Sequence, residues 1–307
     1  MLGSVSKHSA EKSMRGELSA LATACLWAVA TMLFGQLGKQ LPPSVMNLAK
    51  GVIALTLVVI TLLVLQRAPV GLDPRSWGLL LASGGLGIGI GDTLYFTSIN
   101  RIGPRRALLL ETLSPPLGAL LALLFLGEVL SLRAWAGIGL TALGVVWVVS
   151  ERVPTGATSM RPRWQDTTFG VLAALTSAVA AVLSRAALAD TVIDPLWGTL
   201  ARLGGGLAIL LIILRRQGPL PTPRQIAPNR RVLGGLFLAT FLGTYLGIYL
   251  QQTAFKFAPT GIAQSLLATS PLFILPLAAA MGERVSGRAV GGALLALAGV
   301  VLLVMGR

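Results

Sequence analysis

The feature that most constrains the fold of this chain is an internal duplication. The segment 104–149 recurs at 259–304, 155 positions later, and the two copies align without a gap. Identical residues at this spacing include Pro104 and Pro259, Pro116 and Pro271, Gly127-Glu128 and Gly282-Glu283, Gly137 and Gly292, and Gly144 and Gly299. The parts that precede these segments are related more weakly. The sequence therefore predicts one structural unit that occurs twice.

Composition places the duplicated unit in a membrane. The 307 residues are 54% hydrophobic and 12% charged, with a mean hydropathy of +0.78, whereas soluble globular proteins carry about 25% charged residues. A transmembrane helix needs about 20 apolar residues. Ten such stretches are present, at approximately 18–37, 44–66, 77–99, 105–126, 132–150, 168–188, 196–214, 232–254, 260–281 and 287–305.

These observations predict an all-α integral membrane protein with ten transmembrane helices in two inverted five-helix repeats. Each copy has an odd number of spans, so the second crosses the membrane in the opposite sense, as in many secondary transporters. The predicted parts are an N-terminal tail at 1–17, a first repeat at 18–150, a linker at 151–167 and a second repeat at 168–305. The first apolar stretch is long for a cleavable signal peptide, and we expect it to remain as a span.

The charged residues indicate lipid rather than nucleic acid as a partner. The net charge is +14 and the sequence pI is about 11.4, but most Lys and Arg residues lie in loops and at span ends, where they contact anionic headgroups. Nine of them lie on the side of the termini and fourteen on the other side, which favours termini outside the cell. Cys25 and His8 are the only residues of their types, so no metal site, heme or other cofactor is expected.

Four ionisable residues lie inside apolar spans, namely Lys50, Asp92, Glu111 and Arg202. A charge at the bilayer centre costs about 2.5–3.5 kcal/mol on insertion scales, so each must face a cavity or a partner. Lys50 and Arg202 follow Leu-Ala in the second span of each repeat, where they can attract a substrate carboxylate. The alternative is that these residues form structural salt bridges, or that the long side chains reach the membrane interface.

Glu111 is the strongest candidate because its short side chain cannot reach far towards the membrane surface. Ser114-Pro115-Pro116 follows it, and the prolines lack the amide hydrogens that would bond the carbonyls of Glu111 and Thr112 in a continuous helix. Such breaks occur at membrane depth beside water, protein or ligand. A carboxylate there can exchange a proton or bind substrate. The alternative is a structural partner of Lys50 or Arg202.

The remaining candidates are polar or aromatic side chains that can line a cavity. They are Tyr245, Tyr249 and Gln252, which follow i, i+4 and i+7 spacing, Ser265 and Thr269, which lie one turn apart, and Ser114, Trp27 and Tyr95. Residues at these helical spacings share one face. The alternative interpretation is hydrogen bonding and packing between helices.

Glycine spacing predicts close contacts between helices rather than a phosphate loop. The pairs Gly85/Gly89, Gly87/Gly91, Gly243/Gly247, Gly137/Gly144 and Gly292/Gly299 lie four or seven residues apart, which suits small-residue contacts. The Gly-Glu turns at 127–133 and 282–288 are interpreted as architectural connections.

Several motifs resemble the EamA-type branch of the drug/metabolite transporter superfamily. In the first copy these are Tyr95-Phe96-Thr97-Ser98-Ile99-Asn100, Ser114-Pro115-Pro116-Leu117 and Leu126-Gly127-Glu128-Val129-Leu130-Ser131, and in the second they are Ser270-Pro271-Leu272-Phe273 and Gly282-Glu283-Arg284. The basic residues Lys50 and Arg202 also resemble the family pattern, and the likeness covers nearly all of 15–305. Glu111 departs from it, because an acid at this position is not a general family feature.

The resemblance implies two inverted five-helix bundles around a central cavity lined by the first four helices of each, with the fifth and tenth helices as peripheral packing elements. It also implies export or exchange of small metabolites, amino acids or drugs across a bacterial inner membrane, frequently linked to protons. It places the termini in the cytoplasm, opposite to the Lys and Arg count, and the orientation stays open.

Together these features predict a secondary active transporter, an exporter or exchanger of small amphipathic metabolites such as amino acids, working by alternating access. Protons are the candidate coupling ion, and a monomer or weak homodimer is expected. The alternatives are a multidrug or cation exporter and a lipid-linked sugar flippase of the same superfamily. An enzyme is not expected, because no span contains a Ser/His, Asp/Asp or His/Glu catalytic set.

Overall fold

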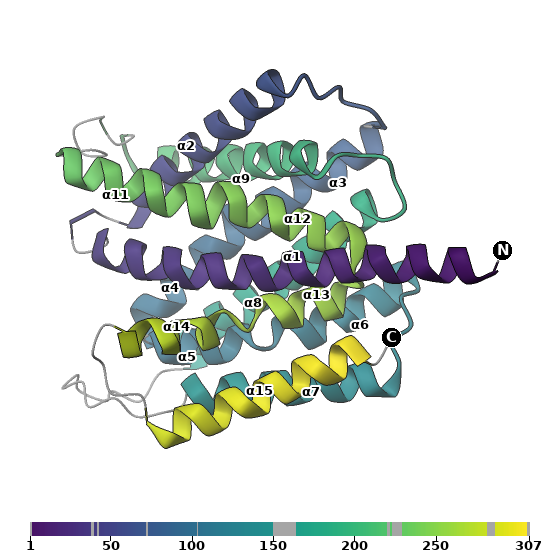
Figure 1. The fold of residues 1–307 in the computed structure, drawn as a ribbon. Coiled ribbons are helices and arrows are strands. Elements are labelled where there is room, and N and C mark those ends of the chain that lie inside the picture. Colours follow the sequence, from purple (N-terminus) through teal and green to yellow (C-terminus); the bar gives the residue numbers. More distant parts are fainter. Residues whose placement is uncertain are drawn as a thin grey trace.

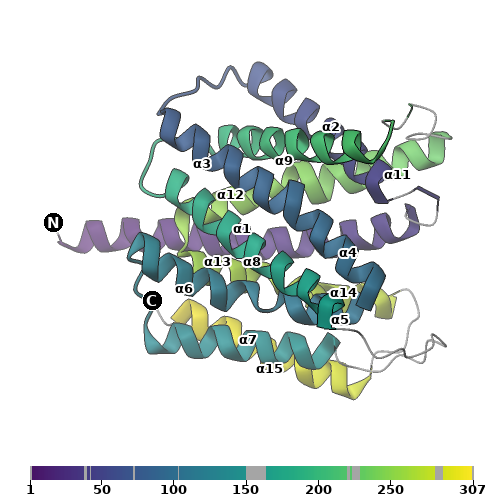
Figure 2. The same cartoon turned by 180° about the vertical axis from the view of Figure 1, so that it is seen from behind.

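The computed structural model describes residues 2–37, 40–41, 43–71, 73–102, 104–149, 164–219, 222, 229–280 and 286–305. Every regular element in these residues is a helix (Figures 1 and 2). The first repeat contains α1 (Leu2–Leu37), α2 (Pro43–Val64), α3 (Pro74–Gly84), η1 (Gly85–Gly91), α4 (Asp92–Ile102), α5 (Pro104–Glu111), α6 (Ser114–Leu126) and α7 (Leu132–Val149). The second contains α8 (Trp164–Leu188), α9 (Pro195–Gln217), α11 (Arg230–Thr240), η2 (Phe241–Leu246), α12 (Gly247–Phe257), α13 (Thr260–Leu267), α14 (Ser270–Ala280) and α15 (Gly287–Met305).

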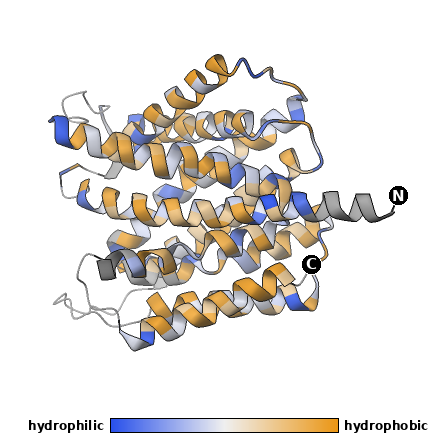
Figure 3. Ribbon diagram, viewed as in Figure 1, coloured by the Kyte–Doolittle hydropathy of each residue, from blue (hydrophilic) through white to orange (hydrophobic). Residues whose placement is uncertain are grey.

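Most of the helices have the length and the apolar composition of membrane spans. Within the described residues, eight helical segments are long and apolar enough to cross a membrane: Glu11–Leu37, Val45–Val64, Pro74–Ile99, Leu132–Val149, Asp166–Leu188, Pro195–Arg216, Arg230–Phe257 and Gly287–Met305. Apolar residues dominate the middle of the bundle, and hydrophilic residues are most frequent near its two ends (Figure 3). The other two predicted spans, at 105–126 and 260–281, are each divided into two short helices.

The first helix runs through the boundary predicted between the tail and the first repeat. α1 begins at Leu2 and continues without a break past residue 17. Glu17 is only 3% exposed, and the Arg15 guanidinium lies 5.0 Å from the centroid of the Phe257 ring. Packing between the repeats therefore begins before residue 18.

The two repeats run in opposite directions. The start of α1 and the end of α15 lie at one end of the bundle, called here the terminus face (Figure 1). The end of α12 is at the same face, because Phe257 contacts Arg15 there. The end of α4 is at the opposite face, where Arg101 forms an ion pair of 3.0 Å with Asp166 near the start of α8. The turns after α4 and α12 correspond in the duplication and lie at opposite faces, as an inverted repeat requires.

The duplication extends to irregular backbone. The π-helices η1 and η2 fall at matching positions, because η2, at 241–246, corresponds to 86–91 in the first repeat. The break between α5 and α6 and the break between α13 and α14 also match to within one residue. Single π-helical turns are rare and occur often at functional sites. The sequence therefore specifies the same two departures from α-helix in each half.

Two glycine-bearing helices join the repeats at the edge of the bundle (Figures 1 and 2). A Cβ atom added at Gly144 of α7 would lie 2.3 Å from the amide nitrogen of Ala296 on α15. A Cβ atom at Gly299 would lie 2.4 Å from the amide nitrogen of Thr141. Both distances are far inside van der Waals contact, so only glycine permits this approach, as the seven-residue spacing predicts. α7 and α15 thus serve as packing elements.

Candidate substrate-binding site

The other three ionisable residues of the apolar spans, Lys50, Glu111 and Arg202, lie near Asp92. The Lys50 Nζ atom of α2 lies 3.1 Å from the Asp92 Oδ2 atom at the start of α4. Glu111 at the end of α5 and Arg202 of α9 both lie within electrostatic range of Asp92. Tyr95, one turn after Asp92, interacts with both carboxylates. Residues from both repeats therefore form one charged cluster, called here the Asp92 cluster.

A π-helix brings Asp92 to this position. η1 ends with the Asp92 amide donating to the Gly87 carbonyl, five residues earlier. A Cβ atom at Gly87 would lie 3.1 Å from an Arg202 guanidinium nitrogen, so η1 passes directly beside that group. Lys50 also lies 5.9 Å from the centroid of the Phe96 ring. Lys50 therefore has a carboxylate partner, and that partner is Asp92 rather than Glu111.

Arg202 has no carboxylate within ion-pair distance among the described residues. It is 6% exposed, and its Nη1 atom donates to the Ser184 hydroxyl and to the Gln252 side-chain oxygen, at 3.2 Å each. The Arg202 Nε atom and the Gln252 Nε2 atom are buried without a partner among the described residues. Charge-assisted hydrogen bonds are typically about 2.7–2.9 Å. The guanidinium is thus held by neutral oxygens at long distances, with donor capacity left over.

Glu111 is part of a polar network that joins the two broken helices. Its carboxylate accepts a hydrogen bond from the Ser177 side chain of α8. The Gln264 Nε2 atom of α13 donates to the Ser177 carbonyl at 3.5 Å. The Ser114 hydroxyl at the start of α6 donates to the Gln264 Oε1 atom at 3.3 Å. Ser114, predicted from sequence, therefore contacts the second repeat through Gln264.

The predicted helix break follows Glu111 directly. α5 ends at Glu111 and α6 begins at Ser114, because Pro115 and Pro116 cannot donate the hydrogen bonds that would continue α5. In the second repeat Pro271 accompanies the break before α14, whereas Pro276 lies inside α14 without ending it. Glu111 is thus the last residue of a half-helix that ends inside the bundle.

The tyrosines of η2 and α12 face α2 and α9. The Tyr245 hydroxyl and the Thr61 hydroxyl are 2.7 Å apart, and the Tyr245 ring stacks on Phe241 with centroids 5.4 Å apart. Tyr249 packs against buried apolar residues of α2 and α9. Gln252, the third residue of this face, binds Arg202. The helical spacing predicted a shared face, and its polar end contacts the Asp92 cluster.

The other predicted residues bond to backbone or pack at the edge of the cluster. The Ser265 hydroxyl donates to the Gly261 carbonyl at 2.8 Å, and the Thr269 hydroxyl donates to the Leu266 carbonyl at 2.6 Å. The Trp27 Nε1 atom donates to the Gly243 carbonyl of η2 at 2.9 Å. The Tyr95 ring lies beside Phe96, with centroids 6.2 Å apart. Trp27 therefore satisfies a carbonyl of the π-helix, which suits a structural role.

Ser177, Ser184 and Gln264 contact the predicted residues but were not predicted from sequence. Ser177 binds Glu111, and Ser184 binds both Arg202 and the Ser83 hydroxyl, the latter at 2.8 Å. The two serines lie seven residues apart on α8, a spacing that places them on one helical face. That spacing is the signal that could have identified them.

A second ion pair closes the terminus face. The Arg185 Nε atom of α8 donates to the Glu128 Oε1 atom at 2.6 Å, and the Thr260 amide of α13 donates to the Glu128 Oε2 atom at 2.8 Å. The Arg185 Nη1 atom also donates to the carbonyls of Phe255 and Lys256, at 3.0 and 2.7 Å. Glu128 belongs to the first Gly-Glu turn, and Gly282-Glu283 of the second lies outside the described residues. The first turn therefore joins the two repeats.

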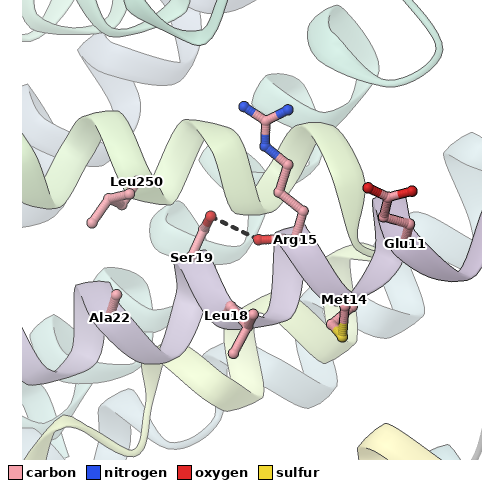
Figure 4. Close-up of a pocket in the computed structure, with 7 residues that line it drawn as sticks. All are labelled: Glu11, Met14, Arg15, Leu18, Ser19, Ala22 and Leu250. Atoms are coloured by element: carbon pink, nitrogen blue, oxygen red, sulfur yellow. Dashed lines mark hydrogen bonds between the residues drawn. The ribbon is translucent and has the colours of Figure 1, made fainter.

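Two surface hollows lie elsewhere. One of about 440 Å³ is formed by α1 and Leu250 and is lined by Glu11, Met14, Arg15, Leu18, Ser19, Ala22 and Leu250 (Figure 4). The other, of about 390 Å³, is lined by Arg101, Thr168, Phe169 and Leu172. Neither is lined by a predicted site residue. The central cavity that the resemblance implies stays a prediction.

The comparison with protein families decides the assignment. A model described as the EamA-like transporter family matches residues 14–150 and again residues 167–305. The chain belongs to the EamA-like transporter family. The resemblance seen in the sequence is thereby confirmed, and this member of the drug/metabolite transporter superfamily is a multi-pass membrane protein with a transporter fold.

A solved structure supports the same fold for this EamA-like protein. One crystal structure of another protein superposes with a TM-score of 0.78, covering 96% of this chain and 98% of that chain at 18% identity. At this identity the likeness shows the fold alone. No curated protein matches the chain in sequence.

Proposed function

We propose that this EamA-like protein is a secondary active transporter of small amphipathic metabolites such as amino acids, an exporter or exchanger that works by alternating access in a bacterial inner membrane. The observation that carries the proposal is the Asp92 cluster, in which charged residues of both repeats converge beside two broken helices. Substrate sites of inverted-repeat transporters lie where the repeats meet, near broken helices. The proposal includes membrane crossings by the helix pairs α5–α6 and α13–α14, giving ten spans.

The geometry supports distinct roles for the charged residues. Arg202 is proposed to bind a substrate carboxylate, because it is buried and its hydrogen bonds among the described residues go to the neutral side-chain oxygens of Ser184 and Gln252. Glu111 is proposed to bind a proton or a substrate amine. Lys50 forms an ion pair of 3.1 Å with Asp92. Its proposed role is to balance the charge of Asp92 and not to bind substrate directly. The faces of Tyr245 and Tyr249 are proposed to contact apolar parts of the substrate.

The purified protein in proteoliposomes tests this function. Counterflow of a panel of labelled amino acids is compared with counterflow of quaternary amines, and amino acids are expected to be exchanged. Arg202→Gln is expected to slow exchange about 100-fold, which equals about 2.7 kcal/mol and is typical of lost charge-assisted hydrogen bonds. Arg216→Gln, at the exposed end of the same helix, is the matched control and keeps its rate.

A cation exporter would behave differently in the same assay. Arg202 has no carboxylate at ion-pair distance among the described residues, and its guanidinium disfavours a cation bound directly beside it, so quaternary amines are expected to exchange more slowly than amino acids. Exchange of quaternary amines that outpaces every amino acid, and persists in Arg202→Gln, would replace the proposed function with the export of cations.

A further inference from the structure

The net charge of the Asp92 cluster depends on whether Glu111 is protonated. Lys50 and Arg202 supply two positive charges, and Asp92 and Glu111 supply two negative charges when both are ionised. With Glu111 ionised the cluster is neutral, and with Glu111 protonated it carries a charge of +1. Net charge inside a membrane is costly, and the cost rises steeply at low dielectric constant. States in which the occupied cluster is neutral are therefore strongly favoured during the transport cycle.

Asp92 and Glu111 differ in their charged neighbours. Asp92 has the Lys50 ammonium group at 3.1 Å as a direct ion-pair partner. Glu111 lies within electrostatic range of Asp92 and Tyr95 on α4, and its hydrogen-bond partner is the Ser177 side chain on α8. The charged residues of α8, Asp166 and Arg185, are engaged at the two faces by other partners, and α7 carries only Arg133, near its start.

The Ser177 hydroxyl suits both protonation states of Glu111. A hydroxyl group can donate to a carboxylate and can accept from a carboxylic acid by rotating its hydrogen. Glu111 has no cationic partner at ion-pair distance among the described residues. Within this cluster Glu111 is therefore the group that can gain and lose a proton while its neighbours stay in place.

Arg202 is the position for the negative group of the cargo. Its two bonds of 3.2 Å go to neutral oxygens of Ser184 and Gln252, which a carboxylate can replace with shorter, charge-assisted bonds. The Arg202 Nε atom and the Gln252 Nε2 atom are buried donors without partners among the described residues, so both can donate to the incoming group.

We propose, building on the transporter function above, that the cluster carries its cargo electroneutrally, and that the charge of the cargo sets the number of protons. A zwitterion is carried with Glu111 ionised and therefore without a proton. A monocarboxylate is carried with Glu111 protonated. In that case one proton from the aqueous phase binds a Glu111 carboxylate oxygen, crosses with the anion, and dissociates on the other side.

Two compounds that differ at the amino group, which is a charged ammonium in one and a neutral acetamide in the other, test this inference. Tyrosine is a zwitterion, and N-acetyltyrosine is the matching monoanion. In proteoliposomes with a gradient of about one pH unit, N-acetyltyrosine is expected to accumulate about tenfold on the alkaline side, whereas tyrosine reaches equal concentrations. A membrane potential imposed with potassium and valinomycin is expected to change neither ratio. Empty liposomes measure the passive leak of each compound.

Glu111→Gln separates proton coupling from binding. This variant fixes the cluster at +1, so N-acetyltyrosine is expected to exchange by counterflow while its accumulation ratio falls from about ten to about one. Glu11→Gln, an exposed carboxylate of α1, is the matched control and keeps the full ratio.

The possible outcomes distinguish this inference from the proposed function. Equal proton-driven accumulation of both compounds, or a response of either to membrane potential, overturns electroneutral coupling but leaves a working transporter. Full accumulation of N-acetyltyrosine by Glu111→Gln also overturns it. If neither compound undergoes counterflow, the proposed function fails for substrates of this kind, and the inference fails with it.

Discussion

The two inner ion pairs of this protein are built for different purposes. Glu128 and Arg185 are each 14% exposed, and both carboxylate oxygens of Glu128 are engaged, one by Arg185 and one by the Thr260 amide. In the Asp92 cluster, the Lys50 and Asp92 side chains are 18% and 33% exposed, and the Arg202 Nε atom nearby has no hydrogen-bond partner among the described residues. The pair at the terminus face is saturated, whereas the cluster keeps capacity for additional ligands.

Helix ends explain part of this difference. Arg185 lies against the last carbonyls of α12, and Glu128 lies against the first amide of α13. Each charge is thus opposite in sign to the end of the helix dipole it contacts, which adds stabilisation to the pair itself. The contrast indicates that a saturated pair holds the repeats together in this conformation, whereas an incompletely paired cluster suits the cargo binding that is proposed for it.

Replacement of Glu128 tests the saturated ion pair and should have the largest effect on stability. In Glu128→Ala, Arg185 stays buried without its carboxylate, and loss of one partner of a buried pair costs about 3 kcal/mol. The unfolding temperature in detergent, followed by tryptophan fluorescence, is expected to fall by about 6–12 °C. Glu11→Ala, which removes an exposed carboxylate from the same end of the bundle, serves as the control. A decrease below about 2 °C for Glu128→Ala would contradict a saturated, stabilising pair.

The sequence predicted features that depend on residues close together in the chain. It did not predict most contacts between side chains that are far apart in the chain. The break after Glu111 follows from Pro115 and Pro116, a few residues away, and the duplication locates the matching break before Ser270. The close approach of α7 and α15 likewise follows from glycine spacing within each helix.

Pairings between distant residues could not be obtained in the same way. Glu128 and Arg185 are 57 positions apart, and Arg202 and Gln252 are 50 apart. Lys50 and Asp92 were each identified because a charge in an apolar span needs a partner, but that rule does not name the partner. Which residue becomes the partner depends on where α2, η1 and α9 pass one another in the folded protein. The linear sequence alone does not specify those positions.

A double-mutant cycle tests the weaker pair. Lys50→Met, Asp92→Asn and the double variant are compared by thermal unfolding, and the coupling energy between the two sites is expected to be about 0.5–1 kcal/mol. The value is small because partial exposure screens the attraction between the two charges. The same cycle on Glu128 and Arg185 should give a coupling energy several times larger. Equal coupling energies at the two pairs would remove the distinction between a saturated pair and an open cluster.

The exposed carboxylate of Asp73 is expected to have the smallest effect on stability of the carboxylates compared here. Asp73 precedes α3, and its side chain accepts a hydrogen bond from the Ser76 amide at 3.0 Å. This bonding, with the Ser76 side chain as the leading contributor, holds the pKa of Asp73 below its usual value of 3.8. Because the folded pKa is lowered, the stabilisation is present above the unfolded pKa and is lost as pH falls through the folded value. Asp73→Asn is therefore expected to match the parent protein at about pH 6, since Asn caps a helix as well as Asp does.

The unfolding temperatures of the variant and the parent protein should differ only in acid. There Asp73 becomes protonated and its capping weakens, whereas the uncharged Asn side chain caps the helix equally at both pH values. Unfolding temperatures measured at about pH 6 and about pH 3 give the comparison. A shift at pH 6 as large as that of Glu128→Ala would mean that exposure does not rank these carboxylates. The ranking would then have to come from helix-end position, which Asp73 and Glu128 share, because each of them accepts a hydrogen bond from a backbone amide in the first turn of a helix.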